Sequence, residues 1–294
     1  MCYNTKAMFW DVLLDAVLDC LKDLPFLFVA FLLLEALEHH VSEKMNKTLA
    51  SAGGLGPLAG SLLGCVPQCG FSIMAAEFYS GGVITLGTLI AVFMSTSDEA
   101  VIILLSNPGR IQDVGLIILT KVILGITAGY LVLAAESAYR RRRHLPTKEI
   151  SHLCTHCGCH EEGHGILLPA IRHTAEVLLV LFLFTLGLNL LFELIGMENV
   201  SRVLLANSVF QPALAALIGL IPNCAASVIL TQLYIDGVIS FGSAIAGLCS
   251  AAGLGLIVLF RMNRSKKESA LIALLLYCLA TLSGVVLQGV SGVM

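Results

Sequence analysis

The sequence predicts an all-α polytopic membrane protein with about ten transmembrane or re-entrant helical segments, arranged as two inverted repeats of five. The first observation behind this prediction is composition: of 294 residues, 57% are hydrophobic and only 13% are charged. Soluble domains are about 45–50% apolar and about 25% charged. The second observation is a series of long apolar stretches, and the third is that the second half of the chain repeats the first.

The apolar stretches set the number of segments, because a spanning helix needs about 20 mostly apolar residues. Six stretches reach or approach this length: 24–40, 83–106, 112–136, 170–196, 237–260 and 269–292. Four shorter stretches form two pairs, each interrupted by a proline: 53–66 with 68–80, and 204–221 with 223–235. Length alone leaves open whether the short pairs cross the membrane or re-enter it.

Polar stretches divide the chain into four parts. These are an amphipathic N-terminal helix (1–22), repeat one (23–137), a polar loop (138–168) and repeat two (169–294). In the first part, Asp11, Asp15 and Asp19 follow one another at intervals of four, which stacks three carboxylates on one helix face. We expect this helix to lie at the membrane interface.

Basic residues predict the orientation. Arg140–Arg143 open the polar loop, and a second cluster surrounds Lys266. With an odd number of crossings per half, twelve of the 17 Lys and Arg residues fall on one face. Cytoplasmic loops collect such residues, so the sequence predicts a multi-pass protein of the cell inner (cytoplasmic) membrane with its central loop in the cytoplasm. The expected partner is the lipid bilayer; the net charge of −3 gives no sign of a nucleic-acid partner, and a homo-oligomer stays open.

The internal repeat is the most informative feature. When residue 64 is placed on residue 219, an offset of 155, positions 64–104 and 219–259 share 14 identities over 41 positions without a gap. Chance matching of two apolar stretches would favour common apolar residues, but these matches include Pro, Cys, Tyr and several Gly. An odd number of crossings per half makes the copies face opposite ways. Inverted repeats are typical of secondary transporters, whose substrate site lies near the bilayer midplane.

Two proline turns at matching positions are the first candidate site. They carry Pro67, Gln68 and Cys69 in repeat one, and Pro222, Asn223 and Cys224 in repeat two. A proline interrupts a helix and frees backbone carbonyls, which in lipid must be buried in protein or face a water-filled cavity. The alternative is a structural kink between two packed helices.

The second candidate is a polar stretch midway along 83–106, which we expect to be one helix. It reads Ser95, Thr96, Ser97, Asp98 and Glu99. Each acid at that depth costs about 2.5–3.5 kcal/mol unless it is paired, hydrated or protonated, so an intramembrane acid marks function by default. The alternative is a buried acid paired with Lys121 or Arg110.

The matching stretch in repeat two begins with Ser250 but holds no acid, so the fold does not require one. Glu77 adds a third acid, opposite Gln232; the alternative for Glu77 is an interfacial position near a segment end. Ser72 and Ser227 also match. We count all four, with Ser250, among the substrate-binding candidates.

The polar loop is rich in metal-binding residue types. Within 13 positions it holds four His and three Cys: His152, Cys154, His156, Cys157, Cys159, His160 and His164. Imidazole and thiolate bind zinc and other borderline or soft ions. Because the spacing does not match a closed zinc finger, we expect a flexible metal loader or sensor; the alternative is a linker without a metal role.

The two proline turns, the stretch from Ser95 to Glu99 and the His/Cys-rich loop resemble the ten-span heavy-metal exporters, variously called manganese or arsenic efflux proteins. That family is distantly similar to the organoarsenical permeases. The resemblance covers nearly the whole chain and implies efflux without an ATPase module. Organoarsenical permeases favour a Cys-rich turn, whereas each turn here has a single Cys after its proline.

The first functional hypothesis is therefore a secondary transporter that exports a heavy or transition metal ion, coupled to a proton or ion gradient. Asp98, Glu99 and Cys69 are the expected intramembrane ligands, and no cofactor is expected apart from the transported metal. The alternative is a permease for arsenite, an organoarsenical or another small organic solute. The sequence predicts no enzyme, because it lacks a His-Glu-x-x-His motif and every His lies in a loop or near a segment end.

Overall fold

The structure is a computed structural model of the chain. It describes residues 54–66, 70–96, 99–107, 111–143, 167–195, 210–263 and 265–291, together with single residues between 13 and 32. Throughout these ranges the regular secondary structure is helical, which confirms the all-α prediction.

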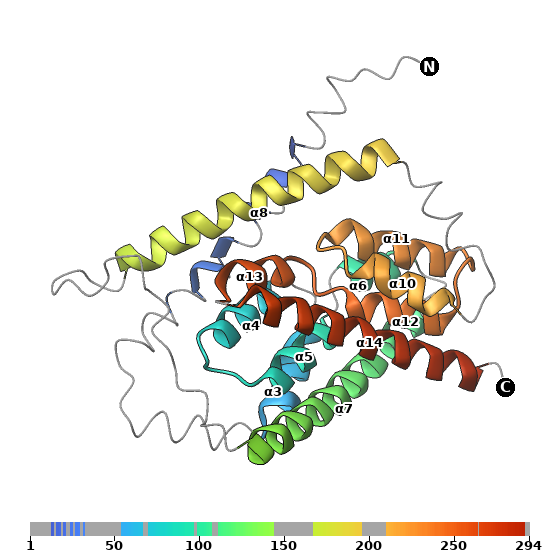
Figure 1. Cartoon of the computed structure of the whole chain (residues 1–294). Helices are drawn as coiled ribbons and strands as arrows, with labels where there is room; N and C mark the ends of the chain where they lie inside the picture. Colours follow the sequence, from blue (N-terminus) through green and yellow to red (C-terminus); the bar gives the residue numbers. More distant parts are fainter. Residues whose placement is uncertain are drawn as a thin grey trace.

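The described helices form two series that follow one another along the chain (Figure 1). The first series is α3 (Gly56–Gly64), α4 (Gly70–Ser80), α5 (Leu86–Ser95), α6 (Glu99–Leu105) and α7 (Ile111–Arg143). The second is α8 (Leu167–Ile195), α10 (Gln211–Gly219), α11 (Cys224–Ile235), α12 (Phe241–Ser250), α13 (Leu254–Met262) and α14 (Lys266–Ser291).

Helix bounds recur at the offset found in the sequence. Helices α3 and α10 begin and end at matching positions, as do α5 and α12, and α7 and α14 begin at matching positions. The packing recurs as well, because α5 lies against both α3 and α7, and α12 lies against both α10 and α14. In Figure 1, α7 and α14 run in opposite directions. The opposite orientation of the two copies in a membrane stays a prediction.

Glycines allow this close packing in both copies. A Cβ added to Gly87 in α5 would lie 2.5 Å from the Gly129 carbonyl oxygen in α7. The matching Gly242 in α12 would meet the Gly284 carbonyl oxygen in α14 at 2.6 Å. Small residues that let backbones approach are the usual way in which helices associate in lipid.

Within the described ranges, four helical stretches are long and apolar enough to cross a membrane, and they differ in burial. The stretches Leu86–Leu105 and Phe241–Met262 are 80% and 89% buried, whereas Ile111–Tyr139 and Lys266–Val290 are 33% and 28% buried. The first two therefore form the centre of the bundle. The last two expose apolar side chains such as Leu131 and Leu271, as expected of helices that face lipid.

The two central stretches are broken helices, which corrects the prediction of one continuous helix over 83–106. Helix α5 ends at Ser95, and Thr96 leaves the helical region with ψ 124°. Helix α12 ends at Ser250, and Gly253, with φ 53° and ψ −140°, precedes α13. That conformation is essentially confined to glycine, so Gly253 fixes the break in repeat two.

The short paired helices are too short to span alone. Helices α3 and α10 have nine residues each, which at 1.5 Å per residue is about 14 Å, roughly half of the hydrocarbon core. Each is followed by a turn and a second short helix, α4 or α11, of 11 or 12 residues. Neither helix of a pair is therefore long enough to span the hydrocarbon core by itself.

The two halves exchange helices across the centre. Helix α4 of the first half packs against α13 of the second, and α11 of the second half packs against α6 of the first. At the first contact a Cβ on Gly255 would lie 2.6 Å from the Ser72 carbonyl oxygen, so the two backbones nearly touch. Each half therefore contributes a helix that packs into the other half.

Candidate functional site

The centre of the molecule is formed by the two helix breaks, one from each half. Thr96 lies at the end of α5, and Ala251 and Ala252 lie beyond the end of α12. All three are buried. Where a helix stops, its last carbonyl groups have no partner within that helix and must find one elsewhere.

Lys121, from the middle of α7, supplies such a partner to both breaks. Its ammonium group donates a hydrogen bond to the Thr96 carbonyl oxygen at the end of α5. It donates a second, at 2.7 Å, to the Leu248 carbonyl oxygen in the last turn of α12. The side chain is only 1% exposed. One buried positive charge therefore joins the carboxyl ends of two helices, which carry partial negative charge.

A serine closes each broken helix in the same way. The Ser95 hydroxyl donates to the Val92 carbonyl oxygen at 3.1 Å. The matching Ser250 hydroxyl donates to the Gly247 carbonyl oxygen at 2.9 Å and to the Ala216 carbonyl oxygen at 2.7 Å. Both hydroxyl protons are thus used within the fold, and each oxygen can still accept a hydrogen bond.

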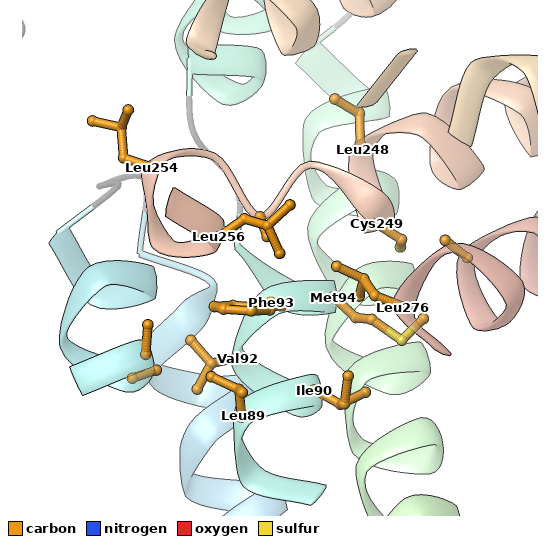
Figure 2. Close-up of a cluster of buried hydrophobic side chains, with 14 of the residues drawn as sticks. Leu89, Ile90, Val92, Phe93, Met94, Leu248, Cys249, Leu254, Leu256 and Leu276 are labelled. Atoms are coloured by element: carbon orange, nitrogen blue, oxygen red, sulfur yellow. The ribbon is translucent and has the colours of Figure 1, made fainter. Parts of the chain in front are cut away.

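Apolar side chains surround the breaks. Figure 2 shows Phe93 and Met94 of α5 next to Leu256 of α13, with Leu248 and Cys249 of α12 nearby. All five side chains are buried. The Lys121 side chain is itself almost completely buried, so its hydrogen bonds to the two carbonyl groups are stronger than they would be in solvent.

Glu77, in α4, is a fully buried acid. Its exposed fraction is 0%, and neither carboxyl oxygen has a hydrogen-bond partner among the residues that the structure describes. Within the described part of the chain, the helices packed most closely on α4 carry one charged residue, Arg261, which lies exposed in α13. An ionised carboxylate without a partner is very unfavourable in such surroundings. These surroundings favour the protonated form of the carboxyl group.

The structure separates the two matched positions 77 and 232. Gln232 is exposed on α11, and its side-chain amide donates to the Asp236 carboxylate at 3.1 Å. It is not brought to the centre with Glu77. Ser72 and Ser227, by contrast, are both buried, in α4 and α11.

The second proline turn is described, and the first is not. Pro222 is half-buried in the turn between α10 and α11. The Asn223 side-chain oxygen accepts from the Ala225 backbone amide at 3.1 Å, so it caps α11. Cys224 is the first residue of α11. Pro67, Gln68 and Cys69 lie outside the described residues.

Several predicted metal ligands also lie outside the described residues. They are Asp98, together with Ser97 beside it, and the loop residues His152, Cys154, His156, Cys157, Cys159, His160 and His164. The backbone of Glu99 begins α6, but its side chain is not described. Among the side chains that are described, no three His, Cys, Asp or Glu lie close enough to share a metal ion.

Two central residues were missed by the sequence reasoning. Lys121 entered only as a partner for the acids, although a lone lysine inside the stretch 112–136 was itself the signal. Gly253 matches Asp98 at the offset of 155. A glycine in place of an acid at a matched position was the signal for the break in repeat two. Both residues lie at or beside the break in repeat two.

Buried broken spans enclosed by helices with exposed apolar faces are a construction found in polytopic α-helical membrane proteins. A family model described as "Putative, 10TM heavy-metal exporter" matches residues 4–194 and 183–292. The chain belongs to this family, and it is a multi-pass membrane protein. Comparison with curated proteins and with solved structures gives no significant match.

Membership in this family agrees with the family resemblance and with the expected ten-span fold class. An exporter family also agrees with the prediction that the chain is not an enzyme.

Proposed function

We propose that this protein is a secondary transporter that exports a heavy or transition metal ion across the cytoplasmic membrane. The observation that carries the proposal is the meeting of two broken helices, one from each repeat, at a buried centre. Broken helices at a repeat interface are the usual construction of a substrate site in secondary transporters. The chain has no Walker A sequence, so the energy comes from an ion gradient.

The proposed metal ligands follow directly on the break in repeat one. Asp98 and Glu99 come two and three residues after Thr96, and Cys69 is the third ligand. Carboxylates suit manganese, and a thiolate adds affinity for zinc, cadmium or arsenic(III). Two carboxylates exceed the single positive charge of Lys121, so the centre keeps a net attraction for a cation.

Glu77 supports protons as the coupling ions. A carboxyl group that is buried and protonated in one conformation can release its proton when another conformation admits water. The proton would then cross the membrane in the direction opposite to that of the metal ion. The proposed counter-transport needs such a group, and Glu77 is a fully buried acid without a hydrogen-bond partner in the described part of the chain.

A neutral solute is the second candidate, and Lys121 is the observation that favours it. A fixed ammonium group at the centre repels a metal cation that would come into direct contact with it. Arsenite, which is neutral at physiological pH, or an organoarsenical would not meet this barrier. On this reading the acids serve as proton carriers only.

Cellular metal content separates the two candidates. The chain is expressed in a metal-sensitive bacterial strain, and manganese, zinc, cadmium, cobalt and arsenic are measured for the wild type and for Asp98→Asn/Glu99→Gln. A fall in one metal cation with the wild type but not with the double variant supports the first proposal. A fall in arsenic alone with the wild type supports the second, and the double variant should then still bind the solute.

Well-expressed protein that changes none of the five elements would count against both. The energy source is tested in vesicles, where collapse of the proton and ion gradients should stop transport. Transport that persists without any gradient contradicts a secondary transporter.

A further inference from the structure

The carboxyl ends of α5 and α12 converge on a single nitrogen atom, the Nζ of Lys121. We propose that these two helix ends form a cation site, and that the Lys121 ammonium occupies it in place of a free monovalent cation. The proposal concerns the two helix ends themselves rather than the ligands of the exported solute, and it goes beyond the transport function proposed above.

The first argument is the charge of the helix ends. Each helix carboxyl end carries about half a negative charge, so two of them together attract roughly one unit of positive charge. Lys121 supplies that charge once, and it comes from a third helix, α7, that packs on both α5 and α12.

The second argument is that the two carbonyl groups lie where their helices stop. In α12, the amide of Ala252 would bond to the Leu248 oxygen if the helix continued, but it bonds to the Ser250 oxygen at 2.8 Å instead. The Leu248 oxygen is thereby left for Lys121. In α5, the Thr96 amide still bonds back into the helix, to the Val92 oxygen at 2.9 Å, and the Thr96 carbonyl accepts from the ammonium.

The third argument is the asymmetry between the repeats. The position that matches Lys121 is Leu276 in α14, which is also fully buried. Only one copy of the repeat carries the charge, because one ammonium group reaches the broken helix of each half. Carbonyl oxygens are also the ligands that hard monovalent and divalent cations accept from proteins.

A tethered cation cannot leave its site, whereas a free one can. The structure therefore predicts that the wild-type protein needs no monovalent cation for its stability. Removal of the lysine side chain should create that need, because the two helix ends remain and the space beside them is opened.

The test is thermal unfolding of the purified full-length chain in detergent at constant ionic strength. Lys121→Ala is compared with the wild type and with Leu276→Ala, which opens a cavity at the matching position without removing a charge. Chloride salts of methylammonium and sodium are compared with that of N-methyl-D-glucamine, a cation too large for the space.

We expect methylammonium or sodium to raise the midpoint of Lys121→Ala by several degrees, about 3 °C or more, and to leave the other two proteins unchanged. No rise for Lys121→Ala, or an equal rise for Leu276→Ala, overturns the proposal. Because no transport is measured, this result does not depend on whether the proposed substrate is right.

A second variant covers the case in which Lys121→Ala yields no folded protein. Lys121→Gln keeps two hydrogen-bond donors and removes the charge. The proposal expects its midpoint to fall well below that of the wild type, by about 5 °C or more. A midpoint equal to that of the wild type shows that hydrogen bonds suffice without the charge, and the proposal is then wrong.

Discussion

Glu77 and Gln232 occupy the same position in the two copies of the repeat, but their surroundings differ. Glu77 is buried and has no hydrogen-bond partner among the described residues, whereas Gln232 is exposed and bonds to Asp236. The two side chains are nearly the same shape, so exchanging them changes charge and protonation rather than volume. This pair allows the coupling role of Glu77 to be tested with little disturbance of the fold.

Glu77→Gln should abolish uphill export driven by a pH gradient, because an amide cannot release a proton. Downhill exchange of the substrate between two compartments should persist, since the substrate ligands remain. Both are measured in proteoliposomes with the same protein, and Gln232→Glu is the matched control, expected to leave coupling unchanged. Uphill export that survives in Glu77→Gln excludes Glu77 as the proton carrier.

Gly219 is a residue at which a single methyl group should be costly. A Cβ there would collide with the Gly247 carbonyl oxygen and lie 2.5 Å from the Ser250 hydroxyl. We expect Gly219→Ala to destabilise the protein by about 1–3 kcal/mol through overpacking. Gly115→Ala in α7 is the control, because nothing lies within 4 Å of its added Cβ; it should be neutral or stabilising by about 0.4–1 kcal/mol. Unfolding in detergent measures both, and equal effects would show that the contact at Gly219 is unimportant.

At the scale of the element, the break between α12 and α13 depends on Gly253. Its backbone, with φ 53° and ψ −140°, is strained for any residue with a Cβ. We expect Gly253→Ala to cost about 1–3 kcal/mol of stability and to reduce transport by more than Gly289→Ala, a control in α14 with open space around its Cβ. Thermal unfolding and vesicle transport are measured together. A variant with normal stability and transport would mean that the break does not need glycine.

Individual helices show which structural features could be predicted from the sequence and which could not. Thr85 and Ser240 occupy matching positions and cap α5 and α12 in the same way, so local sequence accounts for where these two helices begin. The break after Ser95 could not be read from hydropathy, since α5 and α6 together are as apolar as a continuous helix. It is set by tertiary contacts, above all those of Lys121, which lies 25 residues from Thr96 and 127 from Leu248.

The candidate site was predictable in part for the same reason. Matched prolines and serines follow from local patterns, and the structure buries Ser72, Ser95, Ser227 and Ser250 in both repeats. The exposure of Gln232 and the contact of Lys121 with two helix ends depend on which helix faces pack together. The sequence of a single segment does not determine that packing.

At the scale of the whole molecule, the predicted inversion places the starts of α7 and α14 on opposite sides of the membrane. Gln112 and Lys267 are matched positions, and both are exposed near those starts. In intact cells, a membrane-impermeant thiol reagent should label Gln112→Cys from outside and should reach Lys267→Cys only after the cells are opened. Labelling of both from the same side would contradict inverted repeats.

The loop between the two halves should tune transport without being necessary for it. Deletion of residues 151–164 removes four His and three Cys but no predicted membrane segment. We expect the maximal transport rate to stay within about twofold and the metal concentration for half-maximal rate to rise, because the loop is expected to collect metal at the cytoplasmic mouth. Initial rates over a range of metal concentrations measure both quantities. Complete loss of transport by well-folded protein would instead make the loop part of the transport path.

The exchange of helices between the halves sets an order of events during synthesis. Leu254, which begins α13, follows Gly70, which begins α4, by 184 residues. At 5–20 residues per second, α4 waits roughly ten to forty seconds for the helix that covers it. Lys121 likewise has no Leu248 carbonyl to bind until residue 248 has been synthesised, 127 residues later. The first half of the nascent chain therefore enters the membrane with a glutamic acid and a lysine that its own helices cannot fully accommodate, and it becomes a finished structure only when the ribosome has supplied its second copy.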